Sequence, residues 1–453
     1  MFEFFRRHKV WRAVATAALA LMLIAAALPI AVAVLLNPQI TRYVESEAFR
    51  AELEKETANG LHFPSGRYEP IKRTGTWTGE SAGFAANNGW KALKSMDARG
   101  ITVKFNPRGV FLRRWQLDEV RIQSGEVGIQ VYQPKPEPTP AKPWFHIFLP
   151  ERVYLKRVES EPVDVTWQFR GKKGGFLGTR LLITPHGRDF NYQATGGTMK
   201  GALMPDLRLR ETRMLITKTW LTLYNLDLQP KTGDTGRIHM AGKAGTREDK
   251  SVDCKIDIDK MPIDDWLPSD WGEHVAGAAT GTVHWKGKNP KLETSEIDAA
   301  LRVDGGRVSK LPFLVKLATL TNEKELERLA LNDCSLNLVW NYPNAEIKNL
   351  AIEEKGKFRA EGTIKIRNKS LGGEIELGVA RRLLDWLPKP EEVFSRERDG
   401  YLWTTVHLSG TIDTPEQDLS PRIVEALKES PSAALAILFR QFGVWLRDAL
   451  GGN

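Results

Sequence analysis

Apolar and polar side chains alternate along many short stretches of this chain, and this period of two constrains its fold more than any other feature. The alternation is present at residues 101–105, 127–131, 163–169, 254–258, 297–303, 336–340, 364–366 and 375–379. A β-strand directs successive side chains to opposite faces of a sheet. Each stretch therefore predicts a strand with one apolar and one polar face.

Turn-forming residues separate these stretches. They include Asn106-Pro107, Ser124-Gly125, Asp304-Gly305-Gly306, Tyr342-Pro343 and Leu371-Gly372-Gly373. Many strands joined by short turns predict a mainly β protein built on an elongated, curled antiparallel sheet of roughly 20–25 strands. Short helices are predicted at 311–319, 323–331 and 381–387.

The segment from Ala13 to Leu36 contains no charged residue and is long enough to cross a hydrocarbon core of about 30 Å. Four basic residues lie between Arg6 and Arg12, so residues 1–9 are predicted as a cytoplasmic tail and 10–36 as a transmembrane anchor. A cleaved signal peptide is the alternative, because Ala31-Val32-Ala33 resembles a cleavage site. The apolar run is longer than a signal peptide requires, which favours an anchor that is retained.

The rest of the chain divides by composition. We expect a juxtamembrane helix at 37–60, an N-terminal β unit at 61–133, a proline-rich linker at 134–143 and the main β region at 144–430. Residues 431–453 contain AALAILFRQFGVWLRDALGG, which predicts an amphipathic helix. This helix either closes the end of the sheet or contacts a membrane or partner protein through Phe439, Phe442, Trp445 and Leu446.

Motifs for chemistry are missing from the sequence. The histidines lack a helical i, i+4 pair, and no C-x-x-C is present, so zinc spacing is absent. Nucleophile-elbow and phosphate-loop motifs are also absent. Cys254 and Cys334 could form one bridge, but their strand-like apolar positions favour buried free thiols. We therefore predict no catalytic residue, no metal and no cofactor. The net charge of +9 is dispersed, which suits anionic lipid and does not indicate nucleic acid.

A long single sheet has no second sheet to cover its apolar face, so it must curl over itself or bind something apolar. The alternating residues are the candidates for lining a hydrophobic groove, although a shift of one residue would reverse the face. They are Ile101, Val103, Phe105, Val127, Ile129, Val131, Val163, Val165, Trp167, Leu336, Leu338, Trp340, Ile375, Leu377 and Val379.

The order of these features resembles the AsmA-like family of diderm bacteria, which contains AsmA-, TamB- and YhdP-type bridge-like lipid-transfer proteins. The resemblance combines the basic tail and single N-terminal span with four β-rich stretches. These are ARGITVKFNPRGVFLRRWQLDEVRIQSGEVGIQVYQ (98–133), LRVDGGRV (301–308), AEIKNLAIEEKGKFRAEGTIKIRNKSLGGEIELGV (345–379) and TTVHLSGTIDTPEQDL (404–419). Each motif is degenerate, and their order together with the anchor carries the resemblance.

The resemblance implies a taco-like β-groove that shields phospholipid acyl chains and conducts them between the inner and outer membranes, supporting outer-membrane homeostasis. It implies a single-pass inner-membrane protein with its body in the periplasm, no enzymatic activity, and partners that include phospholipids, the inner membrane and an outer-membrane or envelope protein at the C-terminal end. The alternative is an assembly scaffold for outer-membrane or secretion components whose β core is filled by its own side chains. An envelope hydrolase is a third hypothesis, without a supporting motif.

Overall fold

The computed structural model describes residues 37–427, apart from 91–92, 109–114, 131–152, 170–171, 188, 202–203, 218, 246–250, 268–271, 289–291, 312–313, 316–317, 319–322 and 413. These residues are mainly β with few helices, which confirms the mainly β part of the predicted fold. The predicted tail and anchor (1–36), the proline-rich linker (134–143) and the C-terminal helix (431–453) lie outside them. Among the described helices, none combines the length and apolar character that a membrane span requires.

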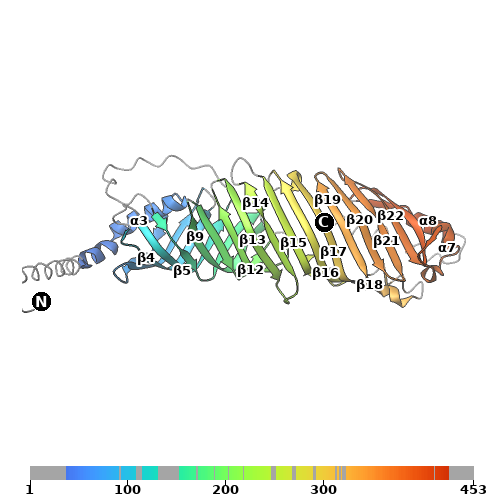
Figure 1. Cartoon of the computed structure of the whole chain (residues 1–453), viewed down its shortest axis with the longest axis horizontal. Coiled ribbons are helices and arrows are strands. Elements are labelled where there is room, and N and C mark those ends of the chain that lie inside the picture. Colours follow the sequence, from blue (N-terminus) through green and yellow to red (C-terminus); the bar gives the residue numbers. More distant parts are fainter. Residues whose placement is uncertain are drawn as a thin grey trace, which may run out of the picture. The chain divides into compact units, whose positions relative to one another are not determined.

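The chain divides into two compact units. The first contains residues 1–171 and 180–184, and the second contains 172–179 and 185–453, so the division falls within strand β9 (Lys172–His186). Figure 1 labels the main elements of each unit. The strands run from β1 to β25, within the predicted range of strand number.

The described part of the first unit combines helical residues near its start with a sheet. Its elements are α3 (Glu47–Leu61), β1 (Gly66–Tyr68), β2 (Ile71–Arg73), β3 (Thr78–Asn87), β4 (Leu93–Phe105), β5 (Trp115–Ile129), β6 (Val153–Leu155), β7 (Val158–Ser160) and β8 (Val163–Phe169). Strands β1 and β2 both pair with β3, and β3, β4 and β5 form an antiparallel meander.

The juxtamembrane region is divided into two helical segments, where one helix was expected at 37–60. Residues 37–44 are helical, and α3 begins after Ser46, whose hydroxyl accepts the Phe49 N–H at 3.2 Å. This N-cap satisfies a donor at the start of α3 and favours a new helix there. The helix continues through Gly60 and ends at His62, which has a left-handed φ of 68°.

The core of the first unit lies between α3 and the sheet. Phe63 follows the helix and is completely buried, together with Ala58, Phe84 and Ile101. The Phe63 N–H donates to the Ala58 carbonyl at 2.8 Å, so the end of α3 is fixed directly over the apolar side chains of β3 and β4.

The pairing of β5 with β6, β7 and β8 is parallel, whereas the sequence predicted an antiparallel sheet. A parallel pair requires a crossover connection of about a dozen residues or more. The segment between β5 and β6, residues 130–152, contains the proline-rich stretch and is long enough for that connection.

The second unit is an antiparallel sheet whose strands follow one another mostly in chain order (Figure 1). Its strands after β9 are β10 (Asp189–Thr195), β11 (Thr198–Lys200), β12 (Leu207–Ile216), β13 (Trp220–Pro230), β14 (Arg237–Gly245), β15 (Val252–Pro262), β16 (Val275–Gly287), β17 (Ser295–Ser309), β18 (Arg328–Leu331), β19 (Asp333–Asn341), β20 (Asn344–Glu354), β21 (Phe358–Arg367), β22 (Ser370–Ala380), β23 (Arg396–Arg398), β24 (Tyr401–Gly410) and β25 (Pro415–Gln417). Its named helices are η2 (Asp264–Trp266), η3 (Leu292–Thr294), η4 (Lys324–Glu327), η5 (Arg381–Leu384), α7 (Pro390–Val393) and α8 (Leu419–Leu427).

The predicted helix at 323–331 is wrong. Residues 324–327 form a single 3₁₀ turn, and 328–331 form β18, which pairs with the end of β17. Leu329 and Leu331 alternate with exposed neighbours in this strand. The local sequence is compatible with a helix, but the unpaired end of β17 offers backbone hydrogen bonds that a strand can use.

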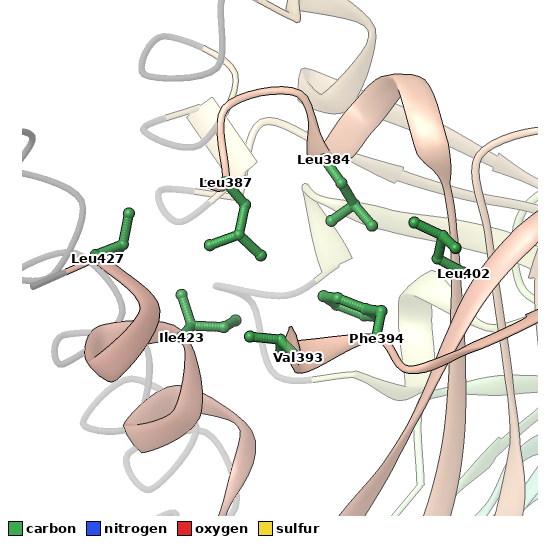
Figure 2. Packing of buried hydrophobic residues seen from close by; sticks show 7 residues of the cluster. All are labelled: Leu384, Leu387, Val393, Phe394, Leu402, Ile423 and Leu427. Atoms are coloured by element: carbon green, nitrogen blue, oxygen red, sulfur yellow. The ribbon is translucent and has the colours of Figure 1, made fainter. Parts of the chain in front are cut away.

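Helices cover the C-terminal end of the second unit. Buried side chains of η5, α7, β24 and α8, and of residues that follow η5 and α7, form what we call the C-terminal cluster. It consists of Leu384, Leu387, Val393, Phe394, Leu402, Ile423 and Leu427. Figure 2 shows Ile423 and Leu427 of α8 directed toward Leu387 and Val393. This end of the sheet therefore has a packed core of its own.

Irregularities within the strands bend the sheet of the second unit. Register shifts occur between β12 and β13, β13 and β14, β15 and β16, β16 and β17, β19 and β20, and β20 and β21. A bulge bends its strand and increases the local twist. Neighbouring strands approach closely at two glycines. A Cβ atom at Gly281 would overlap the Ala300 carbonyl oxygen, and one at Gly362 would overlap the Glu374 carbonyl oxygen.

Gly281→Ala should therefore destabilise the second unit by about 1–3 kcal/mol, because the backbone must move to admit the methyl group. Gly372→Ala is the matched control, since a Cβ there meets nothing within 4 Å. Urea unfolding of both variants measures the difference between their free energies of unfolding. Equal stabilities would show that the close approach at Gly281 has no energetic consequence.

Candidate functional site

One face of the second unit carries continuous apolar rows, which we call the apolar face. Cross-strand register places in one row Leu226, Met240, Ile256, Val283, Ala299, Leu338, Ile347 and Ile364. A second row contains Leu223, Gly242, Cys254, Trp285, Ile297, Trp340, Ala345 and Ile366. Both rows run from β13 to β21 without a charged side chain.

The opposite face is largely polar. In β15, Asp253, Lys255, Asp257 and Asp259 are exposed and alternate with the apolar residues. The predicted division into an apolar and a polar face therefore holds for β15, and the cross-strand register extends it to the neighbouring strands.

Burial changes along the apolar face. On the β12 side, Leu207 and Leu209 are each 1% exposed, and Leu228 of β13 is 3% exposed. At the other end, the C-terminal cluster is equally buried. Between these ends the small side chains of Ala299 and Ala345 are buried. The larger apolar side chains there are half-buried, namely Val283, Trp285, Ile297, Leu301, Leu336, Leu338, Trp340, Ile347, Ile364 and Ile366. The middle of the apolar face is thus shielded less completely than either end.

The one polar atom of the Trp285 side chain forms a hydrogen bond within the sheet. Its indole N–H donates to the Ser295 hydroxyl at 2.8 Å, and Ser295 is 1% exposed. The only polar atom of the indole ring is therefore satisfied within the sheet. The rest of the ring adds apolar surface beside Cys254 and Ile297, its neighbours in the row.

The predicted groove residues of the second unit all lie on the apolar face. Leu336, Leu338 and Trp340 are in its half-buried middle. Ile375 continues it on β22, opposite Gly362. Leu377 and Val379, also on β22, pack against the C-terminal cluster.

The predicted groove residues of the first unit have different surroundings. Ile101 is buried in the core beneath α3, and Val103 packs against that core. Val163 and Val165 are buried, Phe105, Val127 and Trp167 are half-buried, and Ile129 is 37% exposed. Val131, Phe439, Phe442, Trp445 and Leu446 lie outside the described residues.

Sequence reasoning missed Val283, Trp285 and Ile347 as members of the apolar face. Strand β16 is rich in glycine and alanine, which hides its alternation. In β20 a register shift lies between Ile347 and Leu350, so the apolar positions change from odd to even along the strand. Only cross-strand pairing reveals that these residues belong to the rows.

Both cysteines are free thiols on the apolar face. Cys254 is buried and Cys334, in β19, is half-buried. Burial raises the pKa of each thiol, and the neighbouring Asp253 and Asp333 raise it further. Neither is therefore an activated nucleophile. In the part of the chain that the structure describes, no three His, Cys, Asp or Glu side chains are grouped to hold a metal ion.

An ionic cluster on the polar face fixes β13 to β14. Arg237 Nη2 donates to Asp227 Oδ2 at 2.8 Å, and His239 Nδ1 lies 2.8 Å from Asp227 Oδ1. Burial alone would raise the pKa of Asp227, but the hydrogen bonds from His239 and Arg237 outweigh it and hold this pKa below its usual value.

A lowered pKa in the folded state means that Asp227 stabilises the fold above its unfolded pKa of about 3.9. This stabilisation is lost as the pH falls through the folded pKa. Asp227→Asn should therefore reduce the free energy of unfolding by about 1–2 kcal/mol at pH 7. The difference in the free energy of unfolding between the variant and the wild type should become smaller below about pH 4. Urea unfolding at both pH values tests this, and a difference that stays constant would contradict it.

Comparisons with protein-family models, with curated proteins and with solved structures find no match to this chain.

Proposed function

We propose that the apolar face binds phospholipid acyl chains and conducts them, in an inner-membrane-anchored protein whose body lies in the periplasm. The observation that carries the proposal is the pair of apolar rows whose middle is only half-buried. Apolar side chains that the protein's own core does not bury completely can form a binding surface. The bulges and the close approach at Gly281 favour a sheet that curves into a groove.

The energetics suit transport without chemistry. Covering one methylene group of an acyl chain contributes about 0.8 kcal/mol, so a chain lying along several strands gains considerable binding free energy. The hydrophobic effect has no directional requirement. Because successive strands present the same kind of side chain, a bound chain can shift by one strand without losing a specific contact. The resemblance to AsmA-like proteins supports movement of phospholipid between the inner and outer membranes.

Lipid recovery tests the proposal. The protein is purified in mild detergent, and its organic extract is analysed for phospholipid by mass spectrometry. A photo-crosslinking residue at Leu338 or Trp340 should capture phospholipid, whereas one at Asn337, on the opposite face of the same strand, should not. Failure to recover phospholipid, together with no capture at Leu338 and Trp340, would refute the proposal and favour the scaffold alternative.

A further inference from the structure

We propose that Ile40, Tyr43 and Trp77 of the first unit form a contact with a membrane surface, which we call the interface patch. Its partner is the headgroup region of the bilayer that holds the predicted anchor. The interface patch does not depend on lipid conduction by the apolar face. Its partner rests on the membrane anchorage proposed above.

Three large apolar side chains near the start of the first unit are exposed to solvent. The exposed fraction is 45% for Ile40, 54% for Tyr43 and 46% for Trp77. Ile40 and Tyr43 are three positions apart in the helical residues 37–44, so they lie on one side of this helical segment. Trp77 lies in the turn between β2 and β3. The two segments that carry these side chains are far apart in the sequence.

Arg73 of β2 joins the two segments. Its Nη1 donates to the Asn37 carbonyl at 3.1 Å and to the Thr41 hydroxyl at 2.8 Å. Its Nε donates to the Gly75 carbonyl at 3.1 Å, and its Nη2 donates to the Thr76 carbonyl at 3.2 Å. One guanidinium therefore fixes the helical segment beside the turn between β2 and β3. Exposed apolar side chains that are grouped in this way mark a contact surface.

The interface patch is attached firmly to the rest of the first unit. The Phe105 N–H donates to the Trp77 carbonyl at 2.8 Å, which ties the turn to the end of β4. The ring of Tyr43 packs edge-on against that of Phe49, with 5.4 Å between the ring centroids. Phe49 belongs to α3 and is 4% exposed. The patch therefore has a fixed position on the folded unit, as a docking surface requires.

The residue types and their place in the chain identify a bilayer as the partner. Tryptophan and tyrosine concentrate at membrane–water interfaces, where their amphipathic rings lie among the headgroups. Residues 13–36 carry no charge and end directly before Asn37. Four residues of helix rise about 6 Å, which places Ile40 within the headgroup layer of about 5–7 Å that follows the hydrocarbon core. Exposed basic side chains that suit anionic headgroups lie at the same end of the unit, namely Arg42, Lys104 and Arg108.

The interface patch determines how the first unit stands on the membrane. A flexible linker after the anchor would allow the sheet to rotate freely. A helical segment that Arg73 clamps to β2 instead holds the unit at one angle, with the start of β3 and the end of β4 at the bilayer surface. The first strands of the sheet then lie at the membrane from which, under the proposed function, phospholipid enters.

Quenching by a lipid-attached nitroxide tests the contact in the full-length protein. In a variant whose two native cysteines are replaced by alanine, a single cysteine is introduced at each position of the interface patch in turn. Asn87→Cys is the control, because Asn87 is exposed at the opposite end of β3 from the turn. Each cysteine carries an NBD fluorophore, and the protein is reconstituted in nanodiscs of phosphatidylethanolamine and phosphatidylglycerol. A headgroup-labelled nitroxide phosphatidylcholine should quench the three patch positions at least twofold more than Asn87→Cys.

Arg73→Lys tests whether the guanidinium sets the contact. A lysine ammonium lacks the planar fork that reaches the helical segment and the turn together. Quenching at Trp77→Cys should therefore fall at least halfway toward that of Asn87→Cys. Arg67→Lys, at an exposed position of β1, is the control and should leave the quenching unchanged. Urea unfolding of both variants shows whether the first unit remains folded.

The outcomes separate this contact from the proposed lipid conduction. Equal quenching at the interface patch and at Asn87→Cys would overturn the contact, even where phospholipid is recovered with the protein. Stronger quenching at the patch would support it, even where no phospholipid is recovered. Release of the protein from membranes by alkaline carbonate would overturn the anchorage and the contact together. Quenching at Trp77→Cys that Arg73→Lys leaves unchanged would overturn the role of Arg73.

Discussion

Replacing Leu338 with glutamate should lower the phospholipid recovered with the protein at least tenfold while the sheet remains folded. Leu338 is half-buried in the middle of the first apolar row, between Ala299 and Ile347. At a partly open position a carboxylate keeps much of its hydration, so the cost to folding is small. An acyl chain lying on it would have to desolvate that charge, which is unfavourable. A tenfold loss corresponds to about 1.4 kcal/mol of binding free energy.

Two controls define what this result means. Asn337→Glu places the same charge on the opposite face of β19, beside Lys348, and should retain lipid. Leu209→Glu places it where the side chain is 1% exposed, and should unfold the second unit because an unpaired buried charge is costly. Circular dichroism and urea unfolding accompany the lipid measurement. If Leu338→Glu unfolds as Leu209→Glu does, the apolar face is a filled core, and the scaffold alternative is favoured.

Strand positions were the part of the fold that the sequence predicted best. The alternating stretches from Ile101 to Val379 fall within strands as far as the structure describes them, except for Gln130, which follows the end of β5 at Ile129. This success has a simple cause, since a period of two is imposed by the strand itself and needs no knowledge of its partners. Tyr342-Pro343 also forms the expected turn between β19 and β20.

Glycine positions were misinterpreted. Ser124-Gly125, Asp304-Gly305-Gly306 and Leu371-Gly372-Gly373 were predicted as turns but lie inside β5, β17 and β22. Gly305 has a φ of 59° and lies opposite the register shift between Ala276 and Ala278, so it belongs to a bulge. Turns and bulges both use glycine for its positive φ. Only the pairing of β16 with β17 distinguishes them.

The candidate site was predictable in the second unit and less so in the first. Leu336, Leu338 and Trp340 share a face because they alternate, and this follows from the sequence. Ile101 alternates in the same way, yet Phe63 and Ala58 pack with it in one buried core. A long-range contact of α3 with β4 leaves no periodic signal in β4. Alternation therefore identifies an apolar face but not what covers it.

Phe394→Ala should lower the stability of the C-terminal end of the second unit by about 3–5 kcal/mol, the usual cost of removing a buried phenyl ring. Phe394 is 3% exposed and belongs to the cluster that joins Leu384, Leu402 and Ile423. Its N–H donates to the Pro390 carbonyl at 2.8 Å, which fixes the end of α7. The cavity left by the ring would loosen the C-terminal cluster, through which Ile423 and Leu427 hold α8 to the sheet (Figure 2).

Hydrogen exchange measures where this loss falls. Amides of β24 and α8 should exchange faster, whereas those of β13 to β15 should keep their protection, since the C-terminal cluster contains no residue of those strands. Phe394→Leu is the control and should cost less than about 1.5 kcal/mol because it retains most of the buried volume. Uniformly faster exchange across the second unit would contradict an independent C-terminal cluster. Faster exchange confined to β24 and α8 would show that the C-terminal cluster is a core of its own, which holds α8 to the sheet independently of the strands from β13 to β15.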